Sequence, residues 1–238
     1  MIIDFVKKNP FFQNLISSLY SRVPAMVEHN LGKYLALKKA LYLTGLEKLE
    51  GDYLEFGVFT GSSFVFSVKA NRRLHLIHDS SKTRFFGFDS FSGFGNVTTD
   101  DKHPFYQDGT FTVDAQKVIA NIHKQTRGTE VTIVPGYFED TLTKKSAQDY
   151  GIKKARVVFI DCDLLEPSLL ALEFVRPLLQ KGTVLQMDDY YSYKGDPKLG
   201  VQGAFAEFNR RHPEFVWRRV YDYGFGGIGM ILGQVGND

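Results

Sequence analysis

The fold of this chain is decided by the stretch Glu55-Phe56-Gly57-Val58-Phe59-Thr60-Gly61-Ser62-Ser63, which lies between a short apolar run and a segment with the composition of a helix. A strand that passes through a turn with two glycines into a helix lets a ligand approach the backbone, and it presents free N–H groups at the start of the helix. The stretch therefore predicts a strand–turn–helix unit whose turn binds a ligand.

Outward from this turn, short apolar runs rich in Val, Ile, Phe and Tyr alternate with segments of helical pattern. Strands are expected at 52–58, 84–89, 131–135, 156–161 and 183–187, and helices at 61–71, 113–126 and 168–180. The alternation predicts an α/β fold of Rossmann-like type, with a doubly wound and mostly parallel sheet. Two further runs, 215–221 and 226–232, are joined by a short link and predict a C-terminal antiparallel hairpin.

The first 50 residues differ, because their apolar residues recur at helical spacing with Pro24 between two predicted helices. We therefore expect a helical N-terminal cap over 1–50 and one catalytic domain over 51–238. Lys33, Lys38 and Lys39 stand between Leu and Tyr residues, as on a solvated helix face. The apolar residues of the cap also offer a contact surface for a homo-oligomer.

Charge and cysteine content exclude some classes of protein. The chain has 238 residues and a net charge of +2, which gives no reason to expect nucleic acid or a membrane as its partner. It shows neither a signal peptide nor an apolar run of the ~20 residues that a membrane span needs. The single cysteine, Cys162, fits a reducing compartment, so we expect a cytoplasmic protein that acts on a small molecule.

Two acids at neighbouring strand ends favour a nucleoside ligand at the turn. Glu55 stands where a carboxylate would face the ligand crevice, and Asp89 ends the next strand, where it would accept hydrogen bonds from a ribose diol. The turn lacks the G-x-G-x-x-G spacing of dinucleotide sites, and Asp89 lies further along than the usual ~20 residues, so NAD is disfavoured. S-adenosylmethionine, which carries no pyrophosphate, suits this turn better.

Four carboxylates follow the fourth and fifth predicted strands: Asp161, Asp163, Asp188 and Asp189. They would repel one another unless a cation stood between them, and Mg²⁺ or another hard divalent cation prefers such oxygen ligands. A hydroxyl coordinated to the metal becomes a better nucleophile, and a nearby Asp could accept its proton. Asp163 could instead cap the following helix. Cys162 alternates away from both neighbouring acids and is expected to pack.

Several ordered segments together resemble the macrocin O-methyltransferase (TylF-like) family of metal-dependent class I methyltransferases. They are Tyr53–Gly61, Gly87–Gly93, Gly136–Leu142, Ile160–Leu164 and Asp188–Tyr190. The resemblance implies a seven-stranded Rossmann-like domain that methylates sugar hydroxyls of natural products. By motif position it implies that Asp161, Asp188 and Asp189 bind the metal and that Asp163 is the catalytic base. The cofactor-binding residues are then Glu55, Gly57, Thr60, Gly61, Ser62, Ser63, Asp89, Ser90 and Asp161.

Two departures from the family pattern bear on the acceptor. Leu165 replaces an aromatic residue at a position expected to face the acceptor, and the stretch 94–111, with Asp100, Asp101 and His103, is expected to form a substrate-side loop. His103 and His29 are alternative bases, since histidine titrates near neutrality. The tyrosines at 190, 191 and 193 could stack on a sugar or pack locally.

Three other readings of the sequence stay open. The acceptor could be a catechol, because vicinal hydroxyls also chelate Mg²⁺. A metal-dependent glycosyltransferase would explain the D-x-D of Asp161 and Asp163, but it leaves the glycine turn and Asp188-Asp189 without a role. A binding module that has lost catalysis would have no reason to keep four mutually repelling acids.

Overall fold

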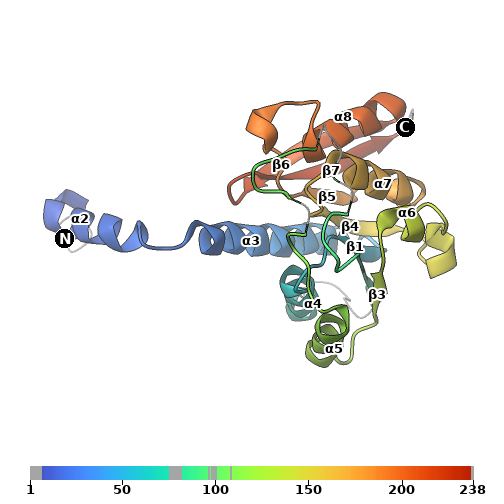
Figure 1. The fold of residues 1–238 in the computed structure, drawn as a ribbon, viewed down its shortest axis with the longest axis horizontal. Coiled ribbons are helices and arrows are strands. Elements are labelled where there is room, and N and C mark those ends of the chain that lie inside the picture. Colours follow the sequence, from blue (N-terminus) through green and yellow to red (C-terminus); the bar gives the residue numbers. More distant parts are fainter. Residues whose placement is uncertain (1–6, 75–81, 96, 98–100, 108, 237–238) are drawn as a thin grey trace.

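The computed structural model describes residues 7–74, 82–95, 97, 101–107 and 109–236. One mixed sheet forms the centre of the molecule, helices cover both of its faces, and an N-terminal arm extends away from it (Figure 1). The predicted α/β fold of Rossmann-like type is confirmed.

The sheet has seven strands in the order β3-β2-β1-β4-β5-β7-β6. Strands β1 to β5 are parallel, and β7 runs antiparallel to both β5 and β6, which confirms the predicted hairpin. The strands are β1 (Asp52–Phe56), β2 (Phe85–Asp89), β3 (Val131–Pro135), β4 (Ala155–Ile160), β5 (Val184–Met187), β6 (Phe215–Tyr223) and β7 (Gly227–Val235).

The helices pack on the two faces of the sheet, except for α2, which lies in the arm. They are α2 (Pro10–Tyr20), α3 (Ala25–Leu46), α4 (Ser62–Arg73), α5 (Ala115–Gln125), α6 (Phe138–Thr141), α7 (Leu165–Val175) and α8 (Gly200–Arg211), with short 3-10 helices η2 (Ala147–Tyr150), η3 (Arg176–Leu178) and η4 (Tyr193–Gly195). Helix α7 begins three residues before the predicted 168, because Pro167 is tolerated inside a first turn. It ends at Val175, since Pro177 cannot continue the helix.

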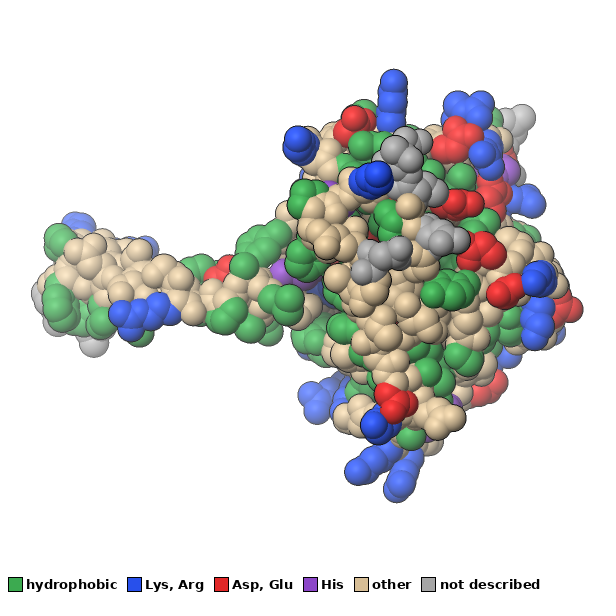
Figure 2. Space-filling view, in the orientation of Figure 1, with side chains coloured by type: hydrophobic (Ala, Val, Ile, Leu, Met, Phe, Trp, Pro, Cys, Tyr) green, Lys and Arg blue, Asp and Glu red, His purple; other side chains and the backbone are tan. Residues whose placement is uncertain are grey.

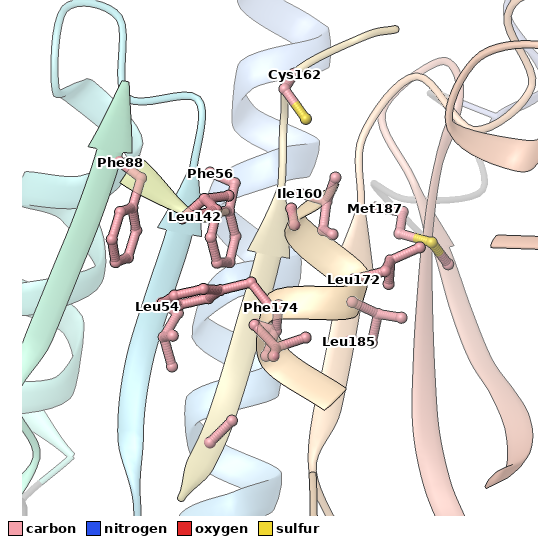
Figure 3. Close-up of a cluster of buried hydrophobic side chains, with 14 of the residues drawn as sticks. Leu54, Phe56, Phe88, Leu142, Ile160, Cys162, Leu172, Phe174, Leu185 and Met187 are labelled. Atoms are coloured by element: carbon pink, nitrogen blue, oxygen red, sulfur yellow. The ribbon is translucent and has the colours of Figure 1, made fainter. Parts of the chain in front are cut away.

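Alternation along each strand builds a separate hydrophobic core on each face of the sheet. Leu54 and Phe56 of β1 point to the face covered by α6, α7 and α8 (Figure 3). Tyr53 points to the opposite face, where α3, α4 and α5 pack. Cys162 lies just beyond the end of β4 and is buried in the first core, as expected of a packing residue.

The N-terminal segment contains the two predicted helices, separated at Pro24. Helix α2 buries none of its residues and lies at the end of the arm, where apolar side chains are exposed (Figures 1 and 2). The second half of α3 is different, because Leu37 and Leu41 are fully buried against the sheet. Among the described residues, no helix is long and apolar enough to cross a membrane.

Candidate active site

A cavity of about 610 Å³ lies at the carboxyl ends of the parallel strands. Its walls are the turn after β1, the end of β2, the residues after β3, the acids after β4 and β5, and the start of α3. Of the predicted cofactor residues, Gly57, Thr60, Ser62, Ser63, Asp89, Ser90 and Asp161 line this cavity. It is therefore a single space that joins the glycine turn to the acids.

Both glycines of the turn are required by packing. Gly57 has a φ of +92°, and a Cβ there would lie 1.8 Å from the carbonyl oxygen of Asp161. Gly61 has a φ of +79°, and a Cβ there would lie 2.7 Å from the Ile122 side chain, so Gly61 faces α5 and does not line the cavity. The close approach at Gly57 holds the ends of β1 and β4 together beneath the cavity.

The carboxylate of Asp89 holds the turn in shape. Its Oδ2 accepts hydrogen bonds from the backbone N–H groups of Val58 at 2.6 Å and Phe59 at 2.7 Å. Its Oδ1 accepts a hydrogen bond from Phe91 N at 2.6 Å. Phe59 has a φ of +48°, and such backbone strain persists only where the surroundings enforce it. Asp89 lines the cavity while it fixes this backbone, and its contact with a ribose stays a prediction.

Glu55 does not face the ligand crevice, so that expectation is wrong. Because residues alternate along β1, its side chain points with Tyr53 to the face beneath α4, where it is fully buried. It accepts hydrogen bonds from the Tyr53 hydroxyl and, at 2.6 Å, from Ser63 Oγ. Burial raises the pKa of Glu55 to about 7, against the lowering effect of these two hydrogen bonds. The hydrogen bond from Ser63 thus connects the start of α4 to Glu55 on β1.

Three of the four predicted acids converge at one place. Single carboxylate oxygens of Asp161, Asp163 and Asp189 lie within 4.8 Å of one another. Asp163 and Asp189 have φ values of +63° and +50°, which are uncommon for residues other than glycine. Burial raises the pKa of Asp161 well above its usual range. It does the same for Asp163, where the neighbouring charge of Asp189 adds to the effect.

The fourth acid, Asp188, is paired with α3. Lys33 Nζ lies 2.5 Å from Asp188 Oδ2 and 2.9 Å from Asp161 Oδ2, and His29 Nε2 lies 3.1 Å from Asp188 Oδ2. Burial alone would lower the pKa of Lys33, but Asp161 and Asp188 raise it well above its usual value. Burial alone would raise the pKa of Asp188, yet Lys33 and His29 hold it below its usual range. The expectation that Lys33 lies on a solvated face is therefore wrong.

The predicted substrate-side loop contributes aromatic side chains to the cavity. Phe94, Phe105, Tyr106 and Phe111 all line it. Asp100 lies outside the described residues, but Asp101 Oδ1 accepts a hydrogen bond from Leu165 N at 2.8 Å and so caps α7. The N-cap position of α7 is Leu164, so Asp163 does not occupy the cap position.

Three other expectations about the acceptor side receive an answer. Leu165 packs against α8, 3.1 Å from where a Cβ of Gly203 would stand. It does not line the cavity, contrary to the expectation that it faces the acceptor. His103 stacks on Tyr106 with ring centroids 4.3 Å apart and also lies outside the lining, whereas His29 belongs to it. The tyrosines at 190, 191 and 193 pack locally and do not line the cavity.

A family comparison agrees with this geometry. The model of the Macrocin-O-methyltransferase (TylF) family matches residues 31–212, well over half of the chain. The chain belongs to this family. The resemblance drawn from the sequence motifs is thereby confirmed, and the family match reaches back into α3 to include Lys33.

A named relative of this TylF family member is an O-methyltransferase. The chain is 29% identical over 177 residues to the 8-demethyl-8-(2,3-dimethoxy-alpha-L-rhamnosyl)-tetracenomycin-C 4'-O-methyltransferase of Streptomyces olivaceus, covering 67% of this chain and 63% of that protein. The chain thus spans less than two thirds of that relative's length.

Solved structures share the fold. CalS11, a calicheamicin methyltransferase also described as a TDP-rhamnose 3'-O-methyltransferase, matches with a TM-score of 0.66 and 22% identity, over 98% of this chain and 90% of CalS11. The O-methyltransferase NovP matches with a TM-score of 0.69 and 19% identity, over 85% of this chain and 80% of NovP.

Sequence reasoning on this TylF family member missed the part that α3 plays in the site. One signal was present, because His29 and Lys33 are four residues apart and so share one face of a helix. What the sequence did not contain was the direction of that face, which depends on how α3 packs across the sheet.

Proposed function

We propose that this protein transfers a methyl group from S-adenosylmethionine to a hydroxyl group of a sugar or a glycosylated small molecule, with the help of a divalent cation. The observation that carries the proposal is the single cavity that joins the glycine turn to the group of Asp161, Asp163 and Asp189. Family membership and the named sugar O-methyltransferase among the relatives support the same reaction.

The residues around the turn would bind the methyl donor. Ser62 and Ser63 begin α4, where free backbone N–H groups favour the negative end of a ligand, and Thr60 stands beside them on the cavity wall. Asp89 and Ser90 line the cavity at the end of β2. We propose that these residues hold the cofactor, and that Glu55 and Gly61 act only by fixing the position of α4.

The acids fit a divalent cation. Three carboxylates within 4.8 Å supply the hard oxygen ligands that Mg²⁺ prefers. Burial raises the pKa of Asp161 and Asp163, an effect that a bound cation would oppose. Asp161 and Asp189 are common to this group and to the set implied by the family, so we propose them as cation ligands. A cation bound there would lower the pKa of the acceptor hydroxyl.

Asp188 and Asp163 take different roles in this proposal. Asp188 Oδ2 is shared by Lys33 and His29, so Asp188 anchors α3 to the site in the arrangement described. Asp163 completes the acid group and is the proposed proton acceptor. Asp163 would accept the hydroxyl proton, and S-adenosylmethionine held at the turn would supply the methyl group. His29 is the alternative base, because it also lines the cavity.

Calorimetry tests the cofactor and the cation separately. We expect S-adenosylmethionine to bind and NADH not to bind; the reverse result would refute the cofactor assignment. Asp189→Asn should weaken binding of Mg²⁺ or Mn²⁺ at least about tenfold and lower turnover, while affinity for S-adenosylmethionine changes little. Asp140→Asn, at an exposed acid that pairs with Lys144, is the matched control. Unchanged cation binding and full turnover in Asp189→Asn would exclude the metal site.

A further inference from the structure

We infer that Tyr223, in the C-terminal hairpin, is a positioning residue whose hydroxyl group holds the carboxylate of Asp188. The inference rests on the proposed function, because it gives a residue outside the cavity lining a part in supporting the acid group. It starts from buried polar atoms that have no hydrogen-bond partner among the described residues: Tyr223 Oη, Asp188 Oδ1, and the side-chain oxygen and nitrogen of Gln186. Such atoms cost free energy when buried unpaired, so each requires an explanation.

The register of the sheet brings Tyr223 and Asp188 into one row. The hairpin of β6 and β7 forms the edge of the sheet beside β5 (Figure 1). Tyr223 on β6 pairs with Gly227 on β7. On the other side of β7, Ile228 pairs with Met187 of β5, so the next residue, Asp188, stands opposite Gly227. Cross-strand partners carry their side chains on the same face, so Tyr223 points across Gly227 towards Asp188.

Gly227 allows the tyrosine ring to cross the strand that lies between. A Cβ on Gly227 would overlap the ring of Tyr223, so only glycine leaves this path open. Burial, and then the neighbouring charges of Asp188 and Asp161, raise the pKa of Tyr223 well above its usual value. The hydroxyl therefore keeps its proton, and it can donate a hydrogen bond to the charged carboxylate of Asp188, which is a strong type of hydrogen bond.

A donor at Oδ1 would fix the orientation of Asp188. Its other oxygen, Oδ2, lies 2.5 Å from Lys33 Nζ, and Lys33 also contacts Asp161. Asp161 and Asp189 are the proposed cation ligands, and Asp189 follows Asp188 directly in the chain. A shift of the Asp188 carboxylate would therefore disturb both ligands. Loss of a residue that orients metal ligands typically lowers metal affinity or activity by about 10–100-fold.

The turn of the hairpin contacts the partners of Asp188 on α3 as well. A Cβ on Gly32 would lie 2.6 Å from Gly224 N, so α3 packs directly on this turn. Phe225 N donates a hydrogen bond to His29 Nδ1 at 3.3 Å, and His29 Nε2 lies 3.1 Å from Asp188 Oδ2. The His29 ring therefore reports a movement of this carboxylate.

The neighbouring row of the sheet supplies a matched control. Tyr221 pairs with Gly229, and a Cβ on Gly229 would overlap the Tyr221 ring. The Tyr221 hydroxyl, however, donates a hydrogen bond of 3.2 Å to the backbone oxygen of Ala36, so it ends on α3 and not at an acid. Tyr223→Phe and Tyr221→Phe therefore remove the same atom from adjacent rows, and only the first removes a donor beside Asp188.

Nuclear magnetic resonance of the His29 ring tests the contact without cation or turnover, with the signals assigned by His29→Gln. We expect the ring nitrogen chemical shifts to change in Tyr223→Phe and to match wild type in Tyr221→Phe. By calorimetry, Tyr223→Phe should bind Mn²⁺ at least about tenfold more weakly, and its kcat should fall at least about tenfold, while affinity for S-adenosylmethionine changes less than about twofold. Tyr221→Phe should keep both the Mn²⁺ affinity and kcat of wild type.

The outcomes separate this inference from the proposed function. Unchanged His29 shifts in Tyr223→Phe, or equal changes in both variants, overturn the inference. Shifts that change while Mn²⁺ affinity and kcat stay at wild-type values overturn it too, because the contact would then have no effect on the acid group. Failure of the wild-type protein to bind S-adenosylmethionine or Mn²⁺ would instead refute the proposed function, and the His29 shifts would still decide whether Tyr223 holds Asp188.

Discussion

At the scale of single residues, the four aspartates differ in the charged partners of their carboxylates and fall into three kinds. Asp188 is paired with a lysine and a histidine, Asp161 shares that lysine, and Asp163 and Asp189 have no cation beside them among the described residues. Their positions after β4 and β5 were readable from the sequence. Their partners were not, because these come from α3, more than a hundred residues away along the chain.

Substitution of Asp163 separates an effect on turnover from an effect on the free energy of unfolding. Asp163→Asn should lower kcat by about 10²–10⁴-fold, as expected for loss of a general base. It should change the free energy of unfolding by less than about 1 kcal/mol, since Asp101 caps α7. Asp101→Ala should instead cost about 1 kcal/mol, measured by urea unfolding. A large loss of stability with little loss of rate in Asp163→Asn would contradict the assignment.

Glu55 predicts a pH dependence of stability. Its folded pKa of about 7 lies above the ordinary value of 4.5, so the folded state binds the proton more tightly than the unfolded state. The contribution of Glu55 is most favourable below about pH 4.5, and about 3 kcal/mol of it is lost as pH rises through 7. Glu55→Gln keeps a neutral side chain, so the difference in unfolding free energy between wild type and variant should grow between pH 5 and 8. Parallel curves would refute the raised pKa.

At the scale of elements, the turn between β1 and α4 was predictable because its glycines and following serines are local signals. The reason for its glycines was not predictable. A side chain at Gly57 would clash with the carbonyl of Asp161 just after β4, and one at Gly61 would clash with Ile122 of α5. The same limit explains Glu55. Its distance from the glycines suggested a ligand contact, whereas the alternation of β1 turned it towards α4.

Gly57→Ala tests the close approach of the two strand ends. A Cβ 1.8 Å from the Asp161 carbonyl forces β1 and β4 apart, so the substitution should cost at least about 3 kcal/mol of unfolding free energy. Gly195→Ala is the matched control, since Gly195 has a similar φ of +75° with open space around it, and it should cost only about 1–2 kcal/mol. Equal costs in chemical denaturation would show that backbone conformation alone requires the glycine.

At the scale of the whole molecule, stability is concentrated in the sheet and its two helical layers, and the arm lies outside both cores. Leu15→Ser in α2 should therefore change the free energy of unfolding by less than about 0.5 kcal/mol. Leu37→Ala, in the buried half of α3, should cost about 2–5 kcal/mol. Chemical denaturation measures both, and a comparable loss in Leu15→Ser would show that the arm belongs to the cooperative fold.

Helix α3 runs without interruption from the exposed arm to the buried side of the sheet. Its 22 residues span about 33 Å, with the arm at one end, Lys33 in the middle and the sheet at the other end. Because only its second half is buried, a tilt of this helix would turn about that half. A tilt of about 5° around Leu41 displaces the backbone at Lys33 by about 1 Å, enough to disturb its contacts with Asp161 and Asp188. Helix α3 therefore joins the exposed arm directly to the acids of the proposed site.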